Sequence, residues 1–232
     1  MSFKFFKTAT ICLTLCFISQ QSFSQFPKSK KADLPETYMF DYSYKLKMTS
    51  KKGDMVLNYY LKKGADYFGY KMDQMEGEQG DMIFVMDKKL NVNVMLMNMA
   101  GQKMLQTTSM NMNEIVSDAS ETNKDFTMKK IGTKTIMGYE CQGFMSESDE
   151  HEITFYIAEK APVSFNNMWT ANAKNMPKGF DSAWMEKFKN GLMMEMIYKD
   201  KKKSKNDMTM TCVELRKTNF SIKTTDYKSF GG

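Results

Sequence analysis

The sequence predicts a mainly β (α+β) fold, in which a few helices pack on the apolar face of an antiparallel sheet. Apolar and polar residues alternate with a period of two through most of the chain, which is typical of strands with one buried and one wet face. Polar turns interrupt this alternation roughly every dozen residues, as in an antiparallel meander. The stretch 162–191 changes to a helical pattern instead.

The first 24 residues have the pattern of a secretory signal peptide. Lys4 and Lys7 give a positive start, and the apolar run 9–18 is too short to span a bilayer. Ser22 and Ser24 are small residues at the spacing that cleavage requires. We therefore expect residues 1–24 to be removed and the protein to be exported, either periplasmic or secreted.

The remaining chain is expected to form a polar linker, 25–37, and one β-rich domain, 38–232. No later stretch is apolar enough to be a membrane helix. About two hundred residues are enough for a single domain with its own core.

In the first half of the domain, the alternation predicts a meander. Aromatic residues such as Phe40, Tyr42 and Tyr44 alternate with polar ones, and Gly53 lies in a tight turn. The polar stretch 108–125 is expected to be a long loop or a short helix. The strands predicted in this half are 40–48, 55–61, 67–72, 82–86 and 90–99.

In the second half, a helical segment separates two pairs of strands. Asp181 or Ser182 can cap a helix on which Trp184 and Phe188 share a face, and Gly191 ends it. The strands predicted around this segment are 135–145, 152–159, 192–198 and 208–215.

Residues that carry catalysis are scarce. The one histidine, His151, lies in an acidic hairpin turn and matches no catalytic motif, so we interpret it as a solvated turn residue. Phosphate-binding loops, CxxC pairs and HExxH helices do not occur in the sequence. We therefore expect no enzyme activity, no cofactor and no metal site.

The basic residues also argue against nucleic acid as a partner. The net charge is +6, and Arg216 is the single arginine. Arginine is the preferred residue for bidentate recognition of bases and phosphates. A mild excess of lysine along the whole chain is typical of a solvated surface.

Two cysteines, Cys141 and Cys212, follow the signal segment. In an exported protein such a pair is a candidate disulfide. The alternative is a pair of buried, inert thiols, because the sequence does not supply the geometry that a disulfide needs.

Methionine is abundant, with 25 residues, and it often recurs at every second position. One interpretation is a solid core that uses Met in place of Leu or Val. Another is an adaptable apolar surface, because unbranched thioethers repack around irregular guests. A third is copper handling, because thioethers suit Cu(I), although such sites usually combine Met with His or Cys.

The segment KKIGTKTIMGYECQGF (129–144), followed by ITFYIAEKAPV, resembles the domain-of-unknown-function family 4412 of exported bacterial proteins. The last two predicted strands fit the same pattern, and the resemblance extends over residues 40–230. Such domains are similar to lipoprotein carriers of the LolA and LolB type. The resemblance implies a curved antiparallel half-barrel that helices close over an apolar cavity, and it carries over no catalytic residue.

These observations predict a non-enzymatic envelope protein that binds or carries a lipid or an acylated segment. The alternatives are a structural or interaction module with a solid Met-rich core, and copper handling; a protein partner is not predicted. In strand 90–99, Met95, Met97 and Met99 share one face, and valines and a leucine share the other. We expect the Met face to line the cavity, with the Val face as the alternative. The predicted cavity residues are Met95, Met97, Met99, Met194, Met196, Trp184 and Phe188.

Overall fold

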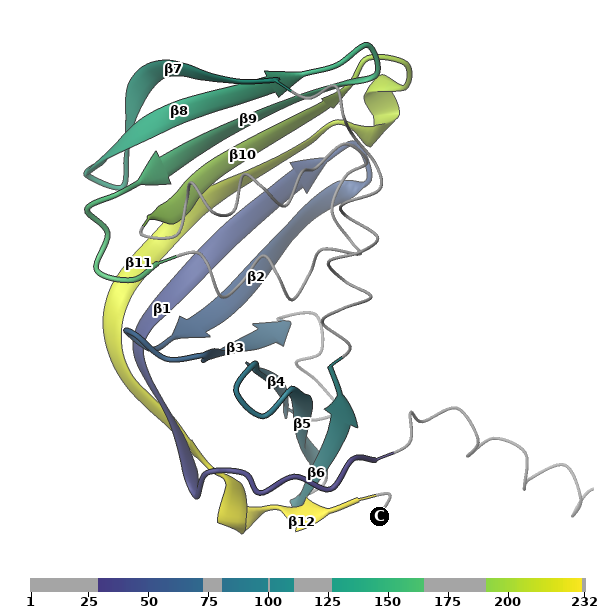
Figure 1. Ribbon diagram of the computed structural model, residues 1–232. Helices are drawn as coiled ribbons and strands as arrows, with labels where there is room; N and C mark the ends of the chain where they lie inside the picture. Colours follow the sequence, from purple (N-terminus) through teal and green to yellow (C-terminus); the bar gives the residue numbers. More distant parts are fainter. Residues whose placement is uncertain (1–28, 73–80, 100, 111–126, 165–190, 231–232) are drawn as a thin grey trace, which may run out of the picture.

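The computed structural model describes residues 29–72, 81–99, 101–110, 127–164 and 191–230. They form one 12-stranded sheet in the order β12-β6-β5-β4-β3-β2-β1-β11-β10-β9-β8-β7, which is open and curved (Figure 1). The strands are β1 (Thr37–Ser50), β2 (Gly53–Leu61), β3 (Tyr67–Met72), β4 (Asp81–Asp87), β5 (Val92–Met99), β6 (Gln102–Ser109), β7 (Thr127–Ile136), β8 (Tyr139–Glu147), β9 (His151–Ala158), β10 (Leu192–Asp200), β11 (Met208–Lys223) and β12 (Lys228–Ser229).

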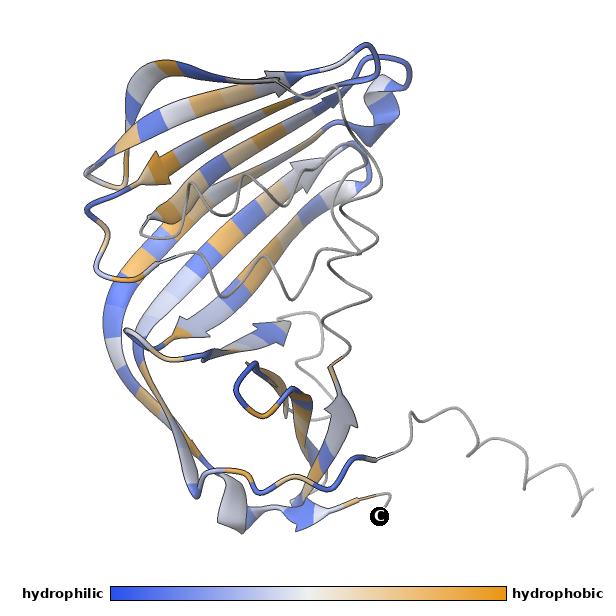
Figure 2. Ribbon diagram, viewed as in Figure 1, coloured by the Kyte–Doolittle hydropathy of each residue, from blue (hydrophilic) through white to orange (hydrophobic). Residues whose placement is uncertain are grey.

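The predicted β-rich, antiparallel architecture is confirmed. Hydrophobic and hydrophilic residues alternate along the strands, as Figure 2 shows, and neighbouring strands pair antiparallel except β12 with β6. Within the described ranges the helical elements are two short 3₁₀ turns, η4 (Ser204–Asn206) and η5 (Thr224–Asp226). The helices predicted in 162–191 fall mostly outside the described residues, as does the predicted signal peptide.

No helix in the described part of the chain is long and apolar enough to cross a membrane.

The curvature of the sheet follows from two irregularities in the long β1–β11 pair. Between Lys217 and Phe220, and again between Cys212 and Glu214, β11 contains one residue more than β1 opposite it. An extra residue of this kind is a β-bulge, which bends the strand and increases its twist. Strand β11 bends along its length in Figure 1, so that its two halves belong to two different parts of the sheet.

The core of the molecule consists of two clusters of buried side chains. The first cluster lies on β1–β3 and β7–β11: Tyr44, Leu46, Tyr59, Leu61, Phe68, Ile136, Cys141, Ile153, Phe155, Ile157, Ala158, Val163, Leu192, Met193, Met194, Met196, Tyr198, Met210 and Cys212. The second cluster lies on β1, β4–β6 and β11: Tyr38, Phe40, Val85, Val92, Val94, Leu96, Leu105 and Ile222.

The two clusters lie on opposite faces of the sheet where they meet at β3. Phe68 belongs to the first cluster, and its neighbour Gly69 faces Phe40 of the second. A Cβ atom at Gly69 would lie 3.1 Å from the Phe40 ring, so glycine permits this close packing. Each face of the central strands therefore has its own apolar environment.

Long-range contacts close the part of the sheet around the second cluster. After η5 the chain returns to β6, where β12 pairs parallel with Met104 and Leu105. Residues 29–36 also reach β6, because the Lys30 N–H donates to the Thr107 carbonyl at 2.8 Å. Ala32 and Leu34 pack against the second cluster.

The strand predicted over 135–145 is confirmed for 139–145, which lies in β8, but it is not one continuous strand, because a tight turn separates residues 135 and 136 from it. Met137 and Gly138 both have positive φ, 51° and 80°, and join β7 to β8 as a hairpin. Positive φ at both central residues is characteristic of a two-residue type I′ turn, which usually contains Asn-Gly or Gly-Gly. Methionine at the first position gave no turn signal in the sequence.

The interpretation of His151 as a solvated turn residue is also wrong. His151 is the first residue of β9 and is 9% exposed. Its Nδ1 lies 2.8 Å from the Tyr198 hydroxyl oxygen, and its backbone pairs with Asp200. Tyr198 comes from the neighbouring strand β10, and its ring centre lies 5.4 Å from that of the imidazole, a contact that the local sequence does not reveal.

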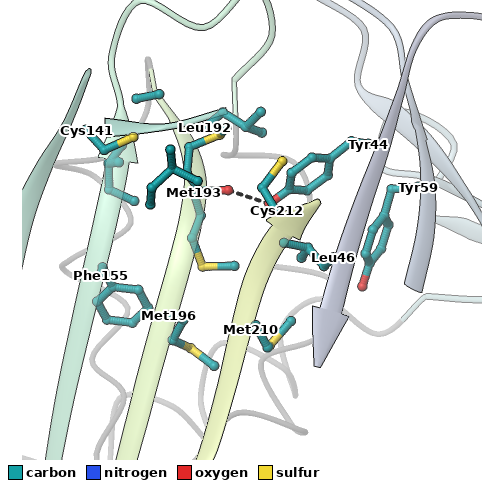
Figure 3. Close-up of a cluster of buried hydrophobic side chains, with 14 of the residues drawn as sticks. Tyr44, Leu46, Tyr59, Cys141, Phe155, Leu192, Met193, Met196, Met210 and Cys212 are labelled. Carbon is teal, nitrogen blue, oxygen red and sulfur yellow. Dashed lines mark hydrogen bonds between the residues drawn. The ribbon is translucent and has the colours of Figure 1, made fainter. Parts of the chain in front are cut away.

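The two cysteines are free thiols, so the predicted Cys141–Cys212 disulfide is not present. Cys141 lies on β8 and Cys212 on β11, and β9 and β10 lie between them (Figure 3). Three strand spacings of about 4.8 Å each therefore separate β8 from β11, whereas a disulfide needs Cα atoms within roughly 7 Å of each other. Burial raises the pKa of both thiols, that of Cys212 to about 11, so both stay protonated at neutral pH.

Candidate apolar binding face

Aromatic and methionine side chains cross the sheet in register on one face of β3–β6. Tyr70 on β3 pairs with Phe84 on β4, and Phe84 pairs with Met95 on β5. Residues paired in this way project to the same side of a sheet. The rings of Tyr70 and Phe84 are stacked, with centroids 4.8 Å apart.

A second line of paired residues on the same face consists of methionines. Met82 pairs with Met97, and Met97 pairs with Met104 on β6. Met86, two residues along β4 from Phe84, projects to this side as well. We call these side chains the aromatic–methionine face: Tyr70, Met82, Phe84, Met86, Met95, Met97 and Met104.

This face continues the surface of the first cluster beyond the packed core. Tyr70 and Met86 pack against that cluster at its margin. Among the described residues, neither cluster includes Met82, Phe84, Met95, Met97 or Met104. Met97 is 6% exposed, and the other members are half-buried.

The polar groups of this face are uncharged. Asn93, Gln106 and Thr108 project to the same side from β5 and β6. The Oδ1 atom of Asn93 is buried and has no hydrogen-bond partner in the described part of the chain. Burial raises the pKa of the Tyr70 hydroxyl, which keeps it neutral at physiological pH. The face is thus apolar, with a few groups that can form hydrogen bonds.

The predicted cavity residues do not all come together. Met95 and Met97 lie on the aromatic–methionine face of β5, and the backbone of Met99 pairs with Gln102. Met194 and Met196 lie on β10, which five other strands separate from β5 in the sheet order, and they are 0% and 1% exposed in the packed first cluster. Trp184 and Phe188 lie outside the described residues.

The alternative assignment of β5, with the Val face inward, corresponds to the second cluster. Val92, Val94 and Leu96 are 0%, 0% and 1% exposed there. Both faces of β5 are thus apolar, and the Val face is packed against protein. The Met face is the one on which half-buried side chains remain.

Sequence reasoning did not include Tyr70, Phe84 and Met82 in the site. Their strands were predicted correctly, and alternation alone places 82, 84 and 86 on one side of β4. What the sequence lacks is the register that sets Phe84 beside Tyr70 and Met95.

The described residues and this face together define a mainly β protein with an open, curved sheet and an uncharged apolar surface. No group of three or more His, Cys, Asp or Glu side chains in the described ranges is arranged to hold a metal ion.

Residues 40–226 match the family described as "Domain of unknown function (DUF4412)", and the chain belongs to this family. The predicted family membership is therefore confirmed. Curated protein sequences give no match.

Several solved structures are similar at low sequence identity. PNGF-II is 8% identical with a TM-score of 0.42, and the match covers 82% of this chain and 30% of that one. MucB in complex with MucA(peri) is 9% identical with a TM-score of 0.41, covering 82% and 54%. A LolA superfamily protein from Nitrosomonas europaea is 9% identical with a TM-score of 0.28, covering 82% and 90%. This chain therefore spans about a third of PNGF-II and about half of MucB.

Proposed function

We propose that this protein is a non-enzymatic protein of the cell envelope that binds an apolar ligand, a lipid or an acylated segment, on the aromatic–methionine face. Export rests on the signal-peptide pattern of residues 1–24. The ligand-binding role rests on the set of half-buried Tyr, Phe and Met side chains on β3–β6.

The chemistry of this face suits an apolar chain. Aromatic rings and thioethers offer large, uncharged contact surfaces, and methionine adapts its shape to irregular guests. Transfer of apolar surface out of water contributes about 25 cal/mol per Å². The Asn93 amide oxygen supplies an acceptor that can orient a hydroxyl or amide group of the ligand.

A structural or interaction module is the second candidate, and one observation favours it. Met193, Met194 and Met196 are at most 1% exposed within the first cluster, so many of the methionines serve as ordinary core residues. A protein with this role would bind its partner through the surface and would not take up isolated acyl chains.

Displacement of a fluorescent apolar probe, N-phenylnaphthylamine, by hexadecanol separates the two candidates. The wild-type protein should bind both compounds. Met95→Asp should weaken binding about tenfold or more, because a charge on the face must be desolvated by the ligand. Far-UV circular dichroism should show that the variant keeps its strand content.

The matched control is Met39→Asp, the same change at a methionine of β1 that is 55% exposed. Binding should stay within about twofold of wild type. Equal binding by the two variants would remove the aromatic–methionine face from the site, and a wild-type protein that binds neither compound would favour the interaction module.

A further inference from the structure

A pocket lies at the edge of the sheet where β6 meets β12. Its volume is about 460 Å³, and its lining includes Gln102, Lys103, Met104, Asp226, Lys228 and Phe230. This volume is within the range of small-ligand sites. The lining combines two cations, one acid and two apolar side chains.

The pocket is continuous with the aromatic–methionine face through Met104. Met104 is the last member of the Met82–Met97–Met104 line and is also part of the pocket wall. Lys228 pairs directly with Met104 across the parallel β12–β6 ladder, so the two side chains lie on the same side of the sheet. A cation therefore stands at the end of a line of methionines.

The charges of the pocket leave a net positive group. Lys103 Nζ lies 3.3 Å from the Asp226 carboxylate, so the charges of Lys103 and Asp226 balance. The same ammonium group lies 5.6 Å from the centre of the Tyr227 ring. Lys228 is exposed and forms no ion pair within the part of the chain that the structure describes. Its ammonium group can therefore serve a ligand without breaking an ion pair to any of the described residues.

We propose that the ligand is an anionic amphiphile whose head group occupies this pocket beside Lys228. This inference rests on the proposed function. Its apolar chain leaves the pocket over Met104 and crosses Met97 toward Met82. Two strand spacings separate β6 from β4, a path on the order of 10 Å. The shared chemistry of the ligand is a carboxylate or phosphate on a single apolar chain.

Isothermal titration with four 16-carbon compounds tests this assignment: hexadecanoic acid, hexadecyl phosphate, hexadecanol and hexadecylamine. The wild-type protein should bind the acid or the phosphate more tightly than the alcohol, and the amine most weakly. The comparison of acid with phosphate distinguishes a fatty-acid head group from a phospholipid one.

Lys228→Gln should weaken binding of the preferred anion about threefold to tenfold and leave hexadecanol within about twofold, because only a charged head group uses the lysine. Lys205→Gln, a change at an exposed lysine of η4, is the matched control and should leave all four compounds unchanged.

If Lys228→Gln loses affinity equally for the anion and for hexadecanol, or loses affinity for neither, the head-group site is overturned. Either result leaves the proposed function intact. A wild-type protein that binds none of the four compounds overturns both proposals.

Discussion

Glu195 on β10 has a carboxylate that is largely removed from water. The residue is 6% exposed, and its Oε2 lies 2.7 Å from the ammonium group of Lys134 on β7. The same ammonium group lies 5.4 Å from the centre of the Tyr156 ring. Because a buried carboxylate is stable only with a partner, this ion pair fixes how the outer strands β7–β10 lie against one another.

Lys134→Met should lower the free energy of unfolding by about 1–3 kcal/mol, because the Glu195 carboxylate loses its charged donor and stays buried. Urea unfolding measures the loss. Lys199→Met is the matched control, since Lys199 pairs with Glu152, whose side chain is 24% exposed. The free energy of unfolding should fall less in the control, because water screens an exposed ion pair. Equal losses in the two variants would contradict this account.

The hairpin of β7 and β8 contains a strained element. Met137 has a φ of 51° and is 51% exposed, so its side chain contributes little to packing. A left-handed conformation costs a residue with a Cβ atom about 1–2 kcal/mol, and Asn tolerates it better than Met.

Met137→Asn should therefore raise the free energy of unfolding by about 1 kcal/mol, because Asn-Gly is a preferred type I′ sequence. Equilibrium unfolding in urea tests the gain, with Met39→Asn at an exposed strand position as the control that should not be stabilised. A loss of stability in Met137→Asn would show that the turn is not strained.

At the scale of the elements, the strands with clear alternation were predictable from the sequence and β6 was not. Gln106 and Thr107 in β6 are polar, yet they are 2% and 6% exposed. Their burial depends on distant segments: the Thr107 hydroxyl donates to the Lys30 carbonyl, and β12 covers the neighbouring edge. Local patterns contain no information on such contacts.

At the scale of the whole molecule, several tyrosine and cysteine side chains are buried in their neutral forms. Burial raises the pKa of Tyr59 to about 12 and that of Cys212 to about 11, and it raises the pKa of Tyr44 well above 10.0. In the first cluster Tyr44 donates its hydroxyl to the Met193 carbonyl, as Figure 3 shows.

These shifts predict a loss of stability at alkaline pH. Below pH 9 the groups are neutral in both states, and their full contribution is present. Above the ordinary values of 9.0 for a thiol and 10.0 for a phenol, the unfolded chain releases protons while the folded protein retains them. The free energy of unfolding therefore falls as pH rises.

Urea midpoints measured from pH 8 to pH 11 should decline, and the decline above pH 10 should be shallower in Tyr59→Phe. Midpoints that stay constant over this range would contradict the buried, neutral state of these side chains.

The sequence was sufficient for the β-rich class, the family and most strands, because these depend on alternation and on local motifs. It was insufficient for the strand order, on which the site depends. The predicted Cys141–Cys212 bond failed because β9 and β10 lie between the two strands. The pairing of β12 with β6 involves two residues on each strand, too few for any recognisable pattern.

The most direct test of the central claim uses the methionines themselves as probes. Methyl-¹³C-methionine NMR spectra of the full chain, titrated with hexadecanoic acid, report which thioethers contact the ligand. The resonances of Met82, Met95 and Met97 should shift, whereas those of Met39 and Met137, which are 55% and 51% exposed elsewhere on the sheet, should not. Spectra in which the methyl resonances of Met82, Met95 and Met97 stay unchanged on titration would contradict an apolar binding site on this face.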